Sequence, residues 1–232
     1  MFSYYGSKSK VVDLYPSPKF DKIIEPFAGS ARYSLKYFDR DVLLVDKYEV
    51  VIKIWLYLQS ATEKDITGLP TLKRGEDIRN LKLSDEEKMF LGMLAGVAST
   101  SPRWKVSEYS SEQKGRKNQL KRIASQLYKI RHWKIIQASY EEIENQKATW
   151  FIDPPYQFGG SGYKHKNIDY KSLSYWIKER EGQSIVCENT KADWMDFYPM
   201  KNLHGAMSDT TEAIWSNYHH DYQAIQLGIF AE

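Results

Sequence analysis

Four consecutive residues, Asp153, Pro154, Pro155 and Tyr156, end an apolar run that predicts a strand, ATWFID. Each proline has a fixed φ and no N–H, and each restricts the residue before it, so the chain is held extended with its carbonyls able to accept hydrogen bonds. The Asp153 carboxylate and the Pro154 carbonyl could hold the two N–H groups of an exocyclic amine on a nucleobase. That geometry favours a tetrahedral nitrogen and frees its lone pair for in-line attack.

Tyr156 places a flat ring beside these two acceptors. A base that has been flipped out of its helix would stack on such a ring. The alternative interpretation is a loop that has the sequence Asp-Pro-Pro-Tyr without any role in chemistry.

A second group of residues suits a nucleoside-containing cofactor. The segment EPFAGSA places Gly29 and small neighbours between a predicted strand and a predicted helix, where a ligand can approach the backbone and unpaired N–H groups. Asp46 ends the next predicted strand, and a carboxylate there can accept both hydroxyls of a ribose. The glycine triplet and the lysine of phosphate-binding loops are missing, so an adenosine cofactor is favoured over a phosphate site. A tight turn followed by an ordinary surface acid is the alternative.

The elements that must position these residues alternate between strands and helices, which predicts a parallel α/β sheet. The predicted strands are 22–25, 41–46, 133–138, 148–153, 184–188, 212–217 and 222–230. Helical periodicity covers 49–60, a segment that begins with a capping box at Ser84 and Glu87, and 116–131. Residues 62–80 and 101–115 are loop-like. Ligands of open α/β sheets bind beyond the carboxyl ends of the strands, so the two candidate sites are expected to meet there.

Composition excludes several classes of protein. Of the 232 residues, 42% are hydrophobic and 27% charged, as in globular proteins. The single cysteine, Cys187, rules out an internal disulfide and a metal site made of cysteines alone, and a reducing, cytoplasmic location is the natural expectation. The apolar runs are too short to span a membrane. The histidine pair in HHDY (219–222) has no ligand-spaced third partner, so no metal is expected.

Charge is concentrated in one segment. Residues 103–134 hold ten basic and two acidic side chains, a local charge of +8 in a chain whose net charge is +3, which leaves −5 for the rest. A basic block on a mildly acidic body predicts a polyanionic partner, most often a nucleic acid, and a solvated helix face is the alternative. Trp104, between Arg103 and Lys105, could be a stacking wedge or could pack the segment internally.

Taken together, these motifs resemble the Dam-type DNA adenine methyltransferases of bacteria and their phages. The resemblance spans most of the chain, through YYGSKSK (4–10), EPFAGSA, VDKYEVVIKIW, FIDPPY and TTEAIWSNY (210–218). It implies a Rossmann-like, S-adenosylmethionine-dependent methyltransferase sheet with helices on both faces. Residues 1–59 and 133–232 would form the catalytic domain, and 60–132 a mostly helical target-recognition insert.

The resemblance also implies an activity and a role for each matching residue. The expected reaction transfers a methyl group from S-adenosylmethionine to the N6 amine of a flipped-out adenine in double-stranded DNA. Tyr4 and Lys8 would contact the cofactor, with Lys8 near its carboxylate. Asp46 would hold the ribose, and Asp153 would lie beside both the cofactor and the target amine. The methionine part would lie against Glu25, Phe27 and Gly29, the base would lie against Pro154, Pro155 and Tyr156, and DNA would contact Arg103, Trp104, Lys105, Arg116, Lys117, Lys121 and Arg122.

Two positions depart from the family pattern. Ala31 stands where the family often has a second glycine, and Ser139 and Tyr140 stand where it commonly has an acid that holds the cofactor's adenine amine. The alternatives are an RNA adenine methyltransferase, a DNA cytosine-N4 methyltransferase, and a nucleic-acid-binding relic without catalysis. The Asp of the DPPY sequence, in place of a Ser, favours adenine by resemblance, and the intact Asp46 and Asp153 argue against a relic.

Overall fold

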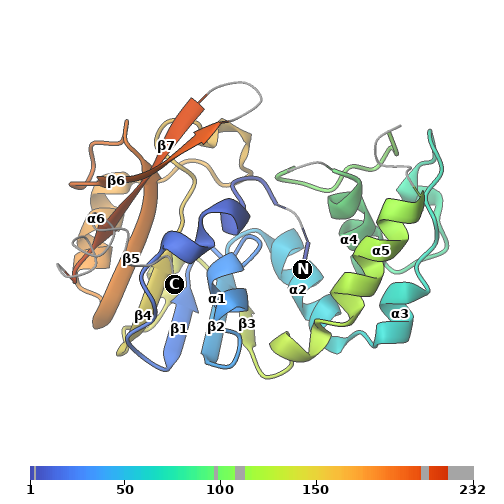
Figure 1. The fold of residues 1–232 in the computed structure, drawn as a ribbon, viewed down its shortest axis with the longest axis horizontal. Helices are drawn as coiled ribbons and strands as arrows, with labels where there is room; N and C mark the ends of the chain where they lie inside the picture. Colours follow the sequence, from blue (N-terminus) through green and yellow to red (C-terminus); the bar gives the residue numbers. More distant parts are fainter. Residues whose placement is uncertain (3, 97–98, 108–112, 205–208, 219–232) are drawn as a thin grey trace.

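The computed structural model describes residues 1–2, 4–96, 99–107, 113–204 and 209–218. Within these residues the chain forms a seven-stranded sheet with the order β3-β2-β1-β4-β5-β7-β6 (Figure 1). The strands are β1 Lys22–Glu25, β2 Asp41–Asp46, β3 Lys134–Gln137, β4 Ala148–Ile152, β5 Gly182–Asn189, β6 Tyr198–His204 and β7 Asp209–Ser216. The strands from β3 to β5 pair in parallel, whereas β7 is antiparallel to both β5 and β6.

The order of the strands places a topological switch between β1 and β4. The chain moves outward from β1 through β2 to β3 and then returns to pair β4 with β1. The carboxyl ends of these two strands therefore lie side by side, with Glu25 and Asp153 at the edge where open α/β sheets bind ligands. This is a Rossmann-like α/β fold, and the Rossmann-like sheet predicted from the sequence is confirmed.

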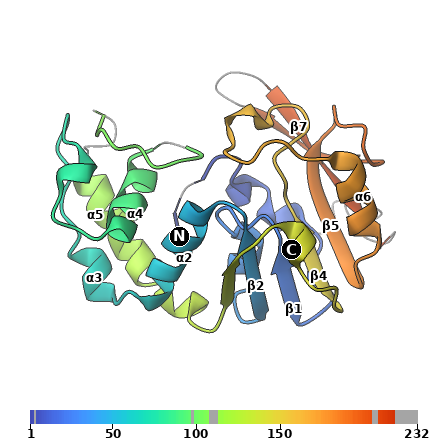
Figure 2. The ribbon, with the colours of Figure 1, turned by 180° about the vertical axis from the view of Figure 1, so that it is seen from behind.

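Both faces of the sheet are covered, because side chains alternate between the two faces along each strand. In β2, Val42 and Leu44 belong to one buried cluster, while Leu43 and Val45 belong to another. The helices α1 Arg32–Lys36 and α2 Glu49–Ser60 cover the first face. The helix α6 Tyr170–Lys178 covers the second face, as the two opposite views show (Figure 1, Figure 2). The prediction of helices on both faces is confirmed.

The described part of the predicted insert, residues 60–132, forms a helical part next to α2, at the end of the molecule away from β6 and β7 (Figure 1, Figure 2). Its helices are α3 Glu63–Thr67, α4 Asp85–Ala95 and α5 Gln113–Ala124. The predicted capping box begins α4, because Ser84 accepts from the Glu87 N–H and the Glu87 side chain accepts from the Ser84 N–H. Phe90 and Leu120 join the same buried cluster as the first face of the sheet. The exact division at 60 and 132 stays a prediction.

Several local predictions were wrong. Residues 62–80 are not loop throughout, since a Thr62–Asp65 capping box starts α3 and Ile66 is buried beneath it. The helix predicted for 116–131 ends at Ala124 and gives way to a 3-10 turn, Leu127–Ile130, although its apolar face is buried as expected.

Two further elements were not predicted. The strand β6 contains Pro199 and lies at the edge of the sheet, where a proline is tolerated. The helix α6 begins at an N-cap, Asp169, whose carboxylate accepts from the N–H groups of Lys171 and Ser172. The predicted strand 212–217 is found within β7, and the one at 222–230 lies outside the described residues.

Candidate active site

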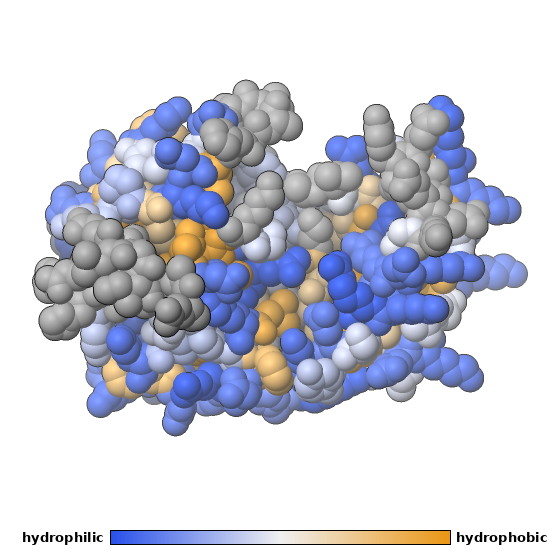
Figure 3. Space-filling model, viewed as in Figure 1, coloured by the Kyte–Doolittle hydropathy of each residue, from blue (hydrophilic) through white to orange (hydrophobic). Residues whose placement is uncertain are grey.

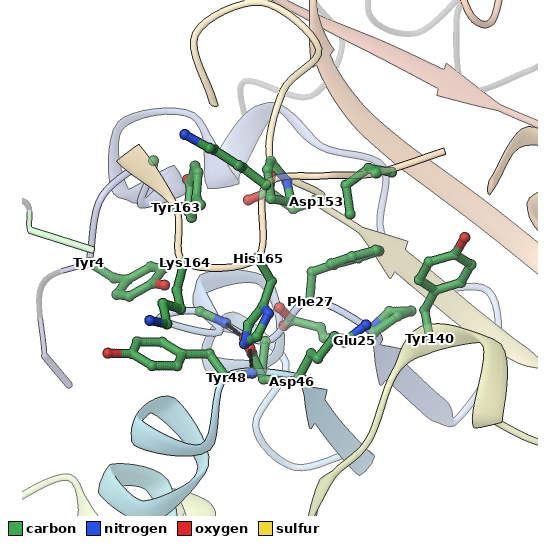
Figure 4. Close-up of a pocket in the computed structure, with 18 of the residues that line it drawn as sticks. Tyr4, Glu25, Phe27, Asp46, Tyr48, Tyr140, Asp153, Tyr163, Lys164 and His165 are labelled. Carbon is green, nitrogen blue, oxygen red and sulfur yellow. Dashed lines mark hydrogen bonds between the residues drawn. The ribbon is translucent and has the colours of Figure 1, made fainter. Parts of the chain in front are cut away.

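The carboxyl ends of β1, β2 and β4 open into one cavity of about 470 Å³. Figure 4 shows Glu25, Asp46 and Asp153 reaching it from the three strand ends. Phe27 and Tyr140 lie at one end of this cavity, and Tyr4 and Tyr48 lie at the other (Figure 4). The sequence-predicted residues that line it are Tyr4, Lys8, Glu25, Phe27, Gly29, Asp46, Asp153 and Pro155. We refer to it as the first cavity.

The turn after β1 uses two left-handed residues. Gly29 and Ala31 both have a φ of +44°, a region that glycine adopts freely and alanine adopts at a cost. Ala31 therefore adopts a left-handed conformation that is usual for glycine, at the position where the family that the sequence resembles often has one. A Cβ on Gly29 would lie 3.3 Å from the Tyr4 ring, so the turn also depends on the small size of this residue.

Asp46 is fixed by the backbone around the first cavity. Its Oδ2 accepts from the Gly29 N–H at 3.1 Å, and its Oδ1 accepts from the Tyr48 N–H at 2.9 Å. Burial raises the pKa of Asp46 to about 6, although these two hydrogen bonds act in the opposite direction. Each carboxylate oxygen has a second lone pair, so the group can still accept the two hydroxyls of a ribose.

Glu25 is buried at the end of β1 and accepts from the Ser34 N–H at 2.8 Å. Ser34 lies in the first turn of α1, where N–H groups have no partner within the helix. Burial raises the pKa of Glu25 to about 8, against the effect of the Ser34 hydrogen bonds. Glu25 thus joins β1 to α1 at the wall of the cavity.

Several residues of the first cavity were missed by the sequence analysis. Glu141 lines it, next to Tyr140, whose ring centroid lies 5.6 Å from that of Phe27. An acid is therefore present two residues beyond position 139, and its place just after the predicted strand 133–138 was the available signal. The segment 163–168 forms a further wall, with Tyr163, Lys164 and His165 over the cavity (Figure 4).

This segment is tied to the amino-terminal segment and to the helical part. The Tyr163 hydroxyl donates to the Tyr5 carbonyl at 3.1 Å. The Thr100 hydroxyl donates to the Gly162 carbonyl at 2.7 Å, and the Tyr5 N–H donates to the Ser99 carbonyl. The wall of the cavity is therefore connected to the region that was predicted to bind DNA.

A second cavity of about 640 Å³ lies next to the first. The two share the lining residues Tyr5, Gly6, Ser7, Lys8 and Tyr163, which therefore separate them. Tyr156 lines the second cavity, whereas Asp153 lines the first. Phe158 and Tyr5 are exposed aromatic residues in the lining of the second cavity. The first residue of the DPPY sequence thus lines the first cavity, and its last residue lines the second.

A charged cluster lies between the cavities. The Lys8 ammonium is 2.8 Å from Asp153 Oδ1 and 3.5 Å from Glu212 Oε1, and it donates to the Tyr156 hydroxyl at 2.6 Å. Glu212 Oε1 accepts from the hydroxyls of Tyr156 and Tyr15, each at 2.6 Å. The sequence analysis did not single out Glu212, because an acid in an apolar strand gives no motif of its own.

The cluster sets the protonation of its members. Burial raises the pKa of Asp153 to about 6; the Lys8 ammonium opposes this rise and the Glu212 carboxylate adds to it. Burial disfavours the Lys8 ammonium, but Asp153 and Glu212 outweigh it and raise the pKa of Lys8 above its ordinary value. The expected contact between Lys8 and a cofactor carboxylate stays a prediction.

The loop that carries the two prolines is held from two sides. The Tyr170 hydroxyl of α6 donates to the Pro155 carbonyl at 2.7 Å. The buried Glu188 of β5 accepts from the Gln157 N–H at 2.9 Å and from the Trp194 indole at 3.2 Å. The backbone of this loop is therefore held by hydrogen bonds to other elements as well as by its two prolines.

The residues predicted to bind nucleic acid differ in their exposure. Exposed side chains are found at Arg103, Lys105, Lys117, Lys121 and Arg122, and hydrophilic residues cover much of the helical part (Figure 3). Arg116 is only 8% exposed, and burial lowers the pKa of its guanidinium. Trp104 is half-buried against the hydrophobic core, which favours the packing interpretation over a wedge.

Metal ligands and membrane-spanning helices were searched for in the described residues. Among them, no group of three His, Cys, Asp or Glu side chains could hold a metal ion. No helix in the same ranges is long and apolar enough to cross a membrane. The HHDY sequence lies outside these ranges.

Comparisons with known proteins give fold-level similarity only. No protein-family model matches the chain, and no curated protein sequence does so either. Similar solved structures include a candidate methyltransferase, yhhF, of Escherichia coli, with 8% identity and a TM-score of 0.36 over 89% of this chain and 78% of that one. A candidate methylase of Haemophilus influenzae has 12% identity and a TM-score of 0.36 over 85% and 87%. A conserved hypothetical protein of Streptococcus pyogenes has 10% identity and a TM-score of 0.32 over 86% and 88%. Similarity this low carries no argument about activity, so the function must be argued from the site.

Proposed function

We propose that this protein transfers a methyl group from S-adenosylmethionine to the N6 amine of an adenine in double-stranded DNA. The observation that carries the proposal is the position of the DPPY sequence between two cavities. Asp153 lines the first cavity, and Tyr156, three positions further along the chain, lines the second. A methyl donor in one cavity and an amine in the other would meet beside the Asp153 carboxylate.

The residues of the first cavity fit S-adenosylmethionine. Its volume lies within the range of small-molecule sites, and aromatic rings stand at both ends. Asp46 would accept the ribose hydroxyls, and Glu141 would accept from the adenine amine beside Tyr140. Phe27, which the resemblance assigned to the methionine part, would instead lie beside the adenine, because its ring is next to that of Tyr140. The methionine part would extend past Glu25 and Gly29 toward Tyr4. When bound, S-adenosylmethionine supplies an electrophilic methyl group on a sulfonium, a cation that a nearby carboxylate stabilises.

The first two residues of the DPPY sequence would activate the amine. The nitrogen lone pair of an adenine amine is delocalised into the ring, so the amine is a poor nucleophile in solution. The Asp153 carboxylate and the Pro154 carbonyl would accept its N–H groups and favour a tetrahedral nitrogen. The new C–N bond would form as the methyl carbon leaves sulfur, whose bonding electron pair stays on the sulfur. The nitrogen would then be far more acidic, and Asp153 would take its proton.

Double-stranded DNA is the proposed substrate for two reasons. The basic block of residues 103–134 suits a polyanion, and the proposed chemistry requires an adenine that has left the base stack. The exposed side chains Lys117, Lys121 and Arg122 lie on α5, and Lys117 and Lys121 are spaced for one face of that helix. Cations on a helix face bind phosphate without reading sequence. A base that leaves the stack could then enter the second cavity and stack near Tyr156.

The experiment is methyl transfer from labelled S-adenosylmethionine to duplex DNA, to RNA and to no nucleic acid, followed by digestion to nucleosides. The expected product is N6-methyladenine in DNA, and Asp153→Asn should give almost none. Label found in adenine of RNA, or at N4 of cytosine in DNA, would show that the substrate is not adenine in DNA. If no acceptor is methylated, the proposal is refuted. Sequencing of methylated bases in a host that expresses the protein would then give the recognition sequence.

A further inference from the structure

Lys8 occupies the place that the proposed function gives to the target amine. Its ammonium lies 2.8 Å from Asp153 Oδ1, which is hydrogen-bond distance for the acceptor that the amine needs. It also lies over the ring of Tyr156, 4.4 Å from the ring centroid, where a flipped base would stack. Within the described residues Lys8 is the cation that contacts Asp153, and it does so at Oδ1. An amine that is to bind this oxygen beside the Tyr156 ring can do so only after Lys8 has moved.

Glu212 is the second carboxylate that Lys8 can reach. Its Oε1 is 3.5 Å from the Lys8 ammonium, on the side of the second cavity. Its side chain is 4% exposed, and a buried carboxylate without partners would be strongly unfavourable. The hydroxyls of Tyr15 and Tyr156 both donate to it, so its charge is stabilised whether or not Lys8 is close.

We propose that Glu212 is a positioning residue that receives the Lys8 ammonium when the target amine takes its place on Asp153. In this arrangement one ammonium is shared by two carboxylates, and only a short movement transfers it from one to the other. Lys8 thereby stands in for the substrate amine while the second cavity is empty of a base. No bond is made or broken in this step, and no proton leaves Lys8. The inference rests on the proposed function.

Four variants separate the parts of this arrangement. Glu212→Gln keeps the shape of the side chain and removes its charge, and Lys8→Met removes the ammonium. The double variant combines the two changes. Tyr15→Phe is the matched control, because it removes a hydrogen bond to the same Glu212 oxygen and leaves both charges in place.

The first measurement needs no nucleic acid. It is the pKa of the Asp153 carboxyl, followed by carbon-13 NMR of labelled aspartate. Loss of the Glu212 charge should lower this pKa and loss of the Lys8 charge should raise it, while Tyr15→Phe should change it less than either. The titratable groups that face Asp153 are Lys8, Tyr15, Glu25, Tyr156, Tyr163, Cys187, Glu188 and Glu212. If neither Glu212→Gln nor Lys8→Met shifts the Asp153 pKa, the Lys8 ammonium is not shared between the two carboxylates.

The second measurement is methyl transfer to DNA in a single turnover, together with the affinity for S-adenosylhomocysteine. Glu212→Gln should slow transfer by about tenfold or more and keep the dissociation constant within about twofold. Adding Lys8→Met to Glu212→Gln should recover most of the lost rate, because no ammonium then has to leave Asp153. A double variant no faster than Glu212→Gln would overturn the inference. So would a loss of about tenfold in cofactor affinity on Lys8→Met alone, which would assign Lys8 to the cofactor's carboxylate.

The two proposals can fail separately. If the wild-type protein methylates DNA and the double variant shows no recovery, the proposed function stands and this inference is wrong. If the wild-type protein methylates no nucleic acid, the proposed function is wrong, and the titration alone decides the inference. Opposite shifts of the Asp153 pKa would then support the shared ammonium, and unchanged values would remove it.

Discussion

The backbone N–H of Gly29 donates to the Asp46 carboxylate at 3.1 Å and so joins the turn after β1 to the end of β2. This one hydrogen bond connects the two features from which a nucleoside site was predicted, the small-residue turn and the acid. It also orients one oxygen of Asp46, since the Tyr48 N–H binds the other. The site is therefore shaped before any ligand arrives.

Removing Asp46 should weaken the binding of S-adenosylmethionine. Asp46→Ala loses charge-assisted hydrogen bonds to the ribose, each of which contributes on the order of 1.5–3 kcal/mol. Asp41→Ala, at the exposed other end of the same strand, is the matched control and should leave affinity unchanged. Isothermal titration calorimetry measures both, and equal affinity for the two variants would refute the ribose assignment.

Replacing Gly29 should destabilise the turn. Gly29→Ala places a side chain at a φ of +44°, which costs about 1–2 kcal/mol for a residue with a Cβ, and the new Cβ must also displace the Tyr4 ring. Gly115→Ala is the control, because this residue lies in α5 with no atom near its Cβ position and should gain about 0.5–1 kcal/mol. Urea unfolding gives both values. A loss at Gly115 as large as that at Gly29 would rule out the left-handed conformation as the cause.

Stability should fall as pH rises from about 4.5 to about 8 through the buried Glu25. Burial raises its pKa from 4.5 to about 8, so in this window the folded chain keeps a proton that the unfolded chain releases. The free energy of unfolding therefore decreases with rising pH. Glu25→Gln, which can still accept from the Ser34 N–H, should flatten this dependence in urea titrations at pH 5 and pH 8. A profile parallel to that of the wild type would show that Glu25 does not contribute.

The basic face of α5 should contribute to the salt dependence of DNA binding. Replacing Lys117, Lys121 and Arg122 with Ala should lower the slope of log affinity against log salt by about 0.9 for each lost phosphate contact. Arg116 is left unchanged because it is buried. A control with Lys147, Lys178 and Lys191 replaced, three exposed cations elsewhere, should keep the slope. If the two triple variants behave alike, the block is only a solvated face.

The motifs at the strand ends could be predicted from the sequence because residues close to them in the chain determine their local conformation. A buried strand, a proline pair and a small-residue turn fix local geometry, so the meeting of Glu25, Asp46 and Asp153 at one edge follows once the sheet is parallel. The capping box at Ser84 was visible for the same reason.

Contacts between distant elements were not predictable in this way. Glu212 meets Lys8 only because β7 inserts between β5 and β6, an arrangement that no local pattern specifies. The second cavity and the wall at Tyr163 likewise depend on how a loop after β4 folds back on the amino-terminal segment. Arg116 carries the same charge as its neighbours in the sequence, and only tertiary packing shows that it is buried.

The most direct test of the proposed chemistry is Asp153→Asn, assayed for both DNA binding and turnover. The amide keeps the shape of the side chain but can present a donor where the amine needs an acceptor. Tyr156→Ala provides the contrast, since lost stacking, worth about 1–3 kcal/mol, should reduce both the rate and the retention of an extrahelical base reported by 2-aminopurine fluorescence. Asp196→Asn, an exposed acid outside both cavities, is the control. The account predicts that Asp153→Asn binds DNA with nearly unchanged affinity and methylates almost none of it. Near-normal methylation by Asp153→Asn would show that the DPPY sequence here is a turn and that the active site lies elsewhere.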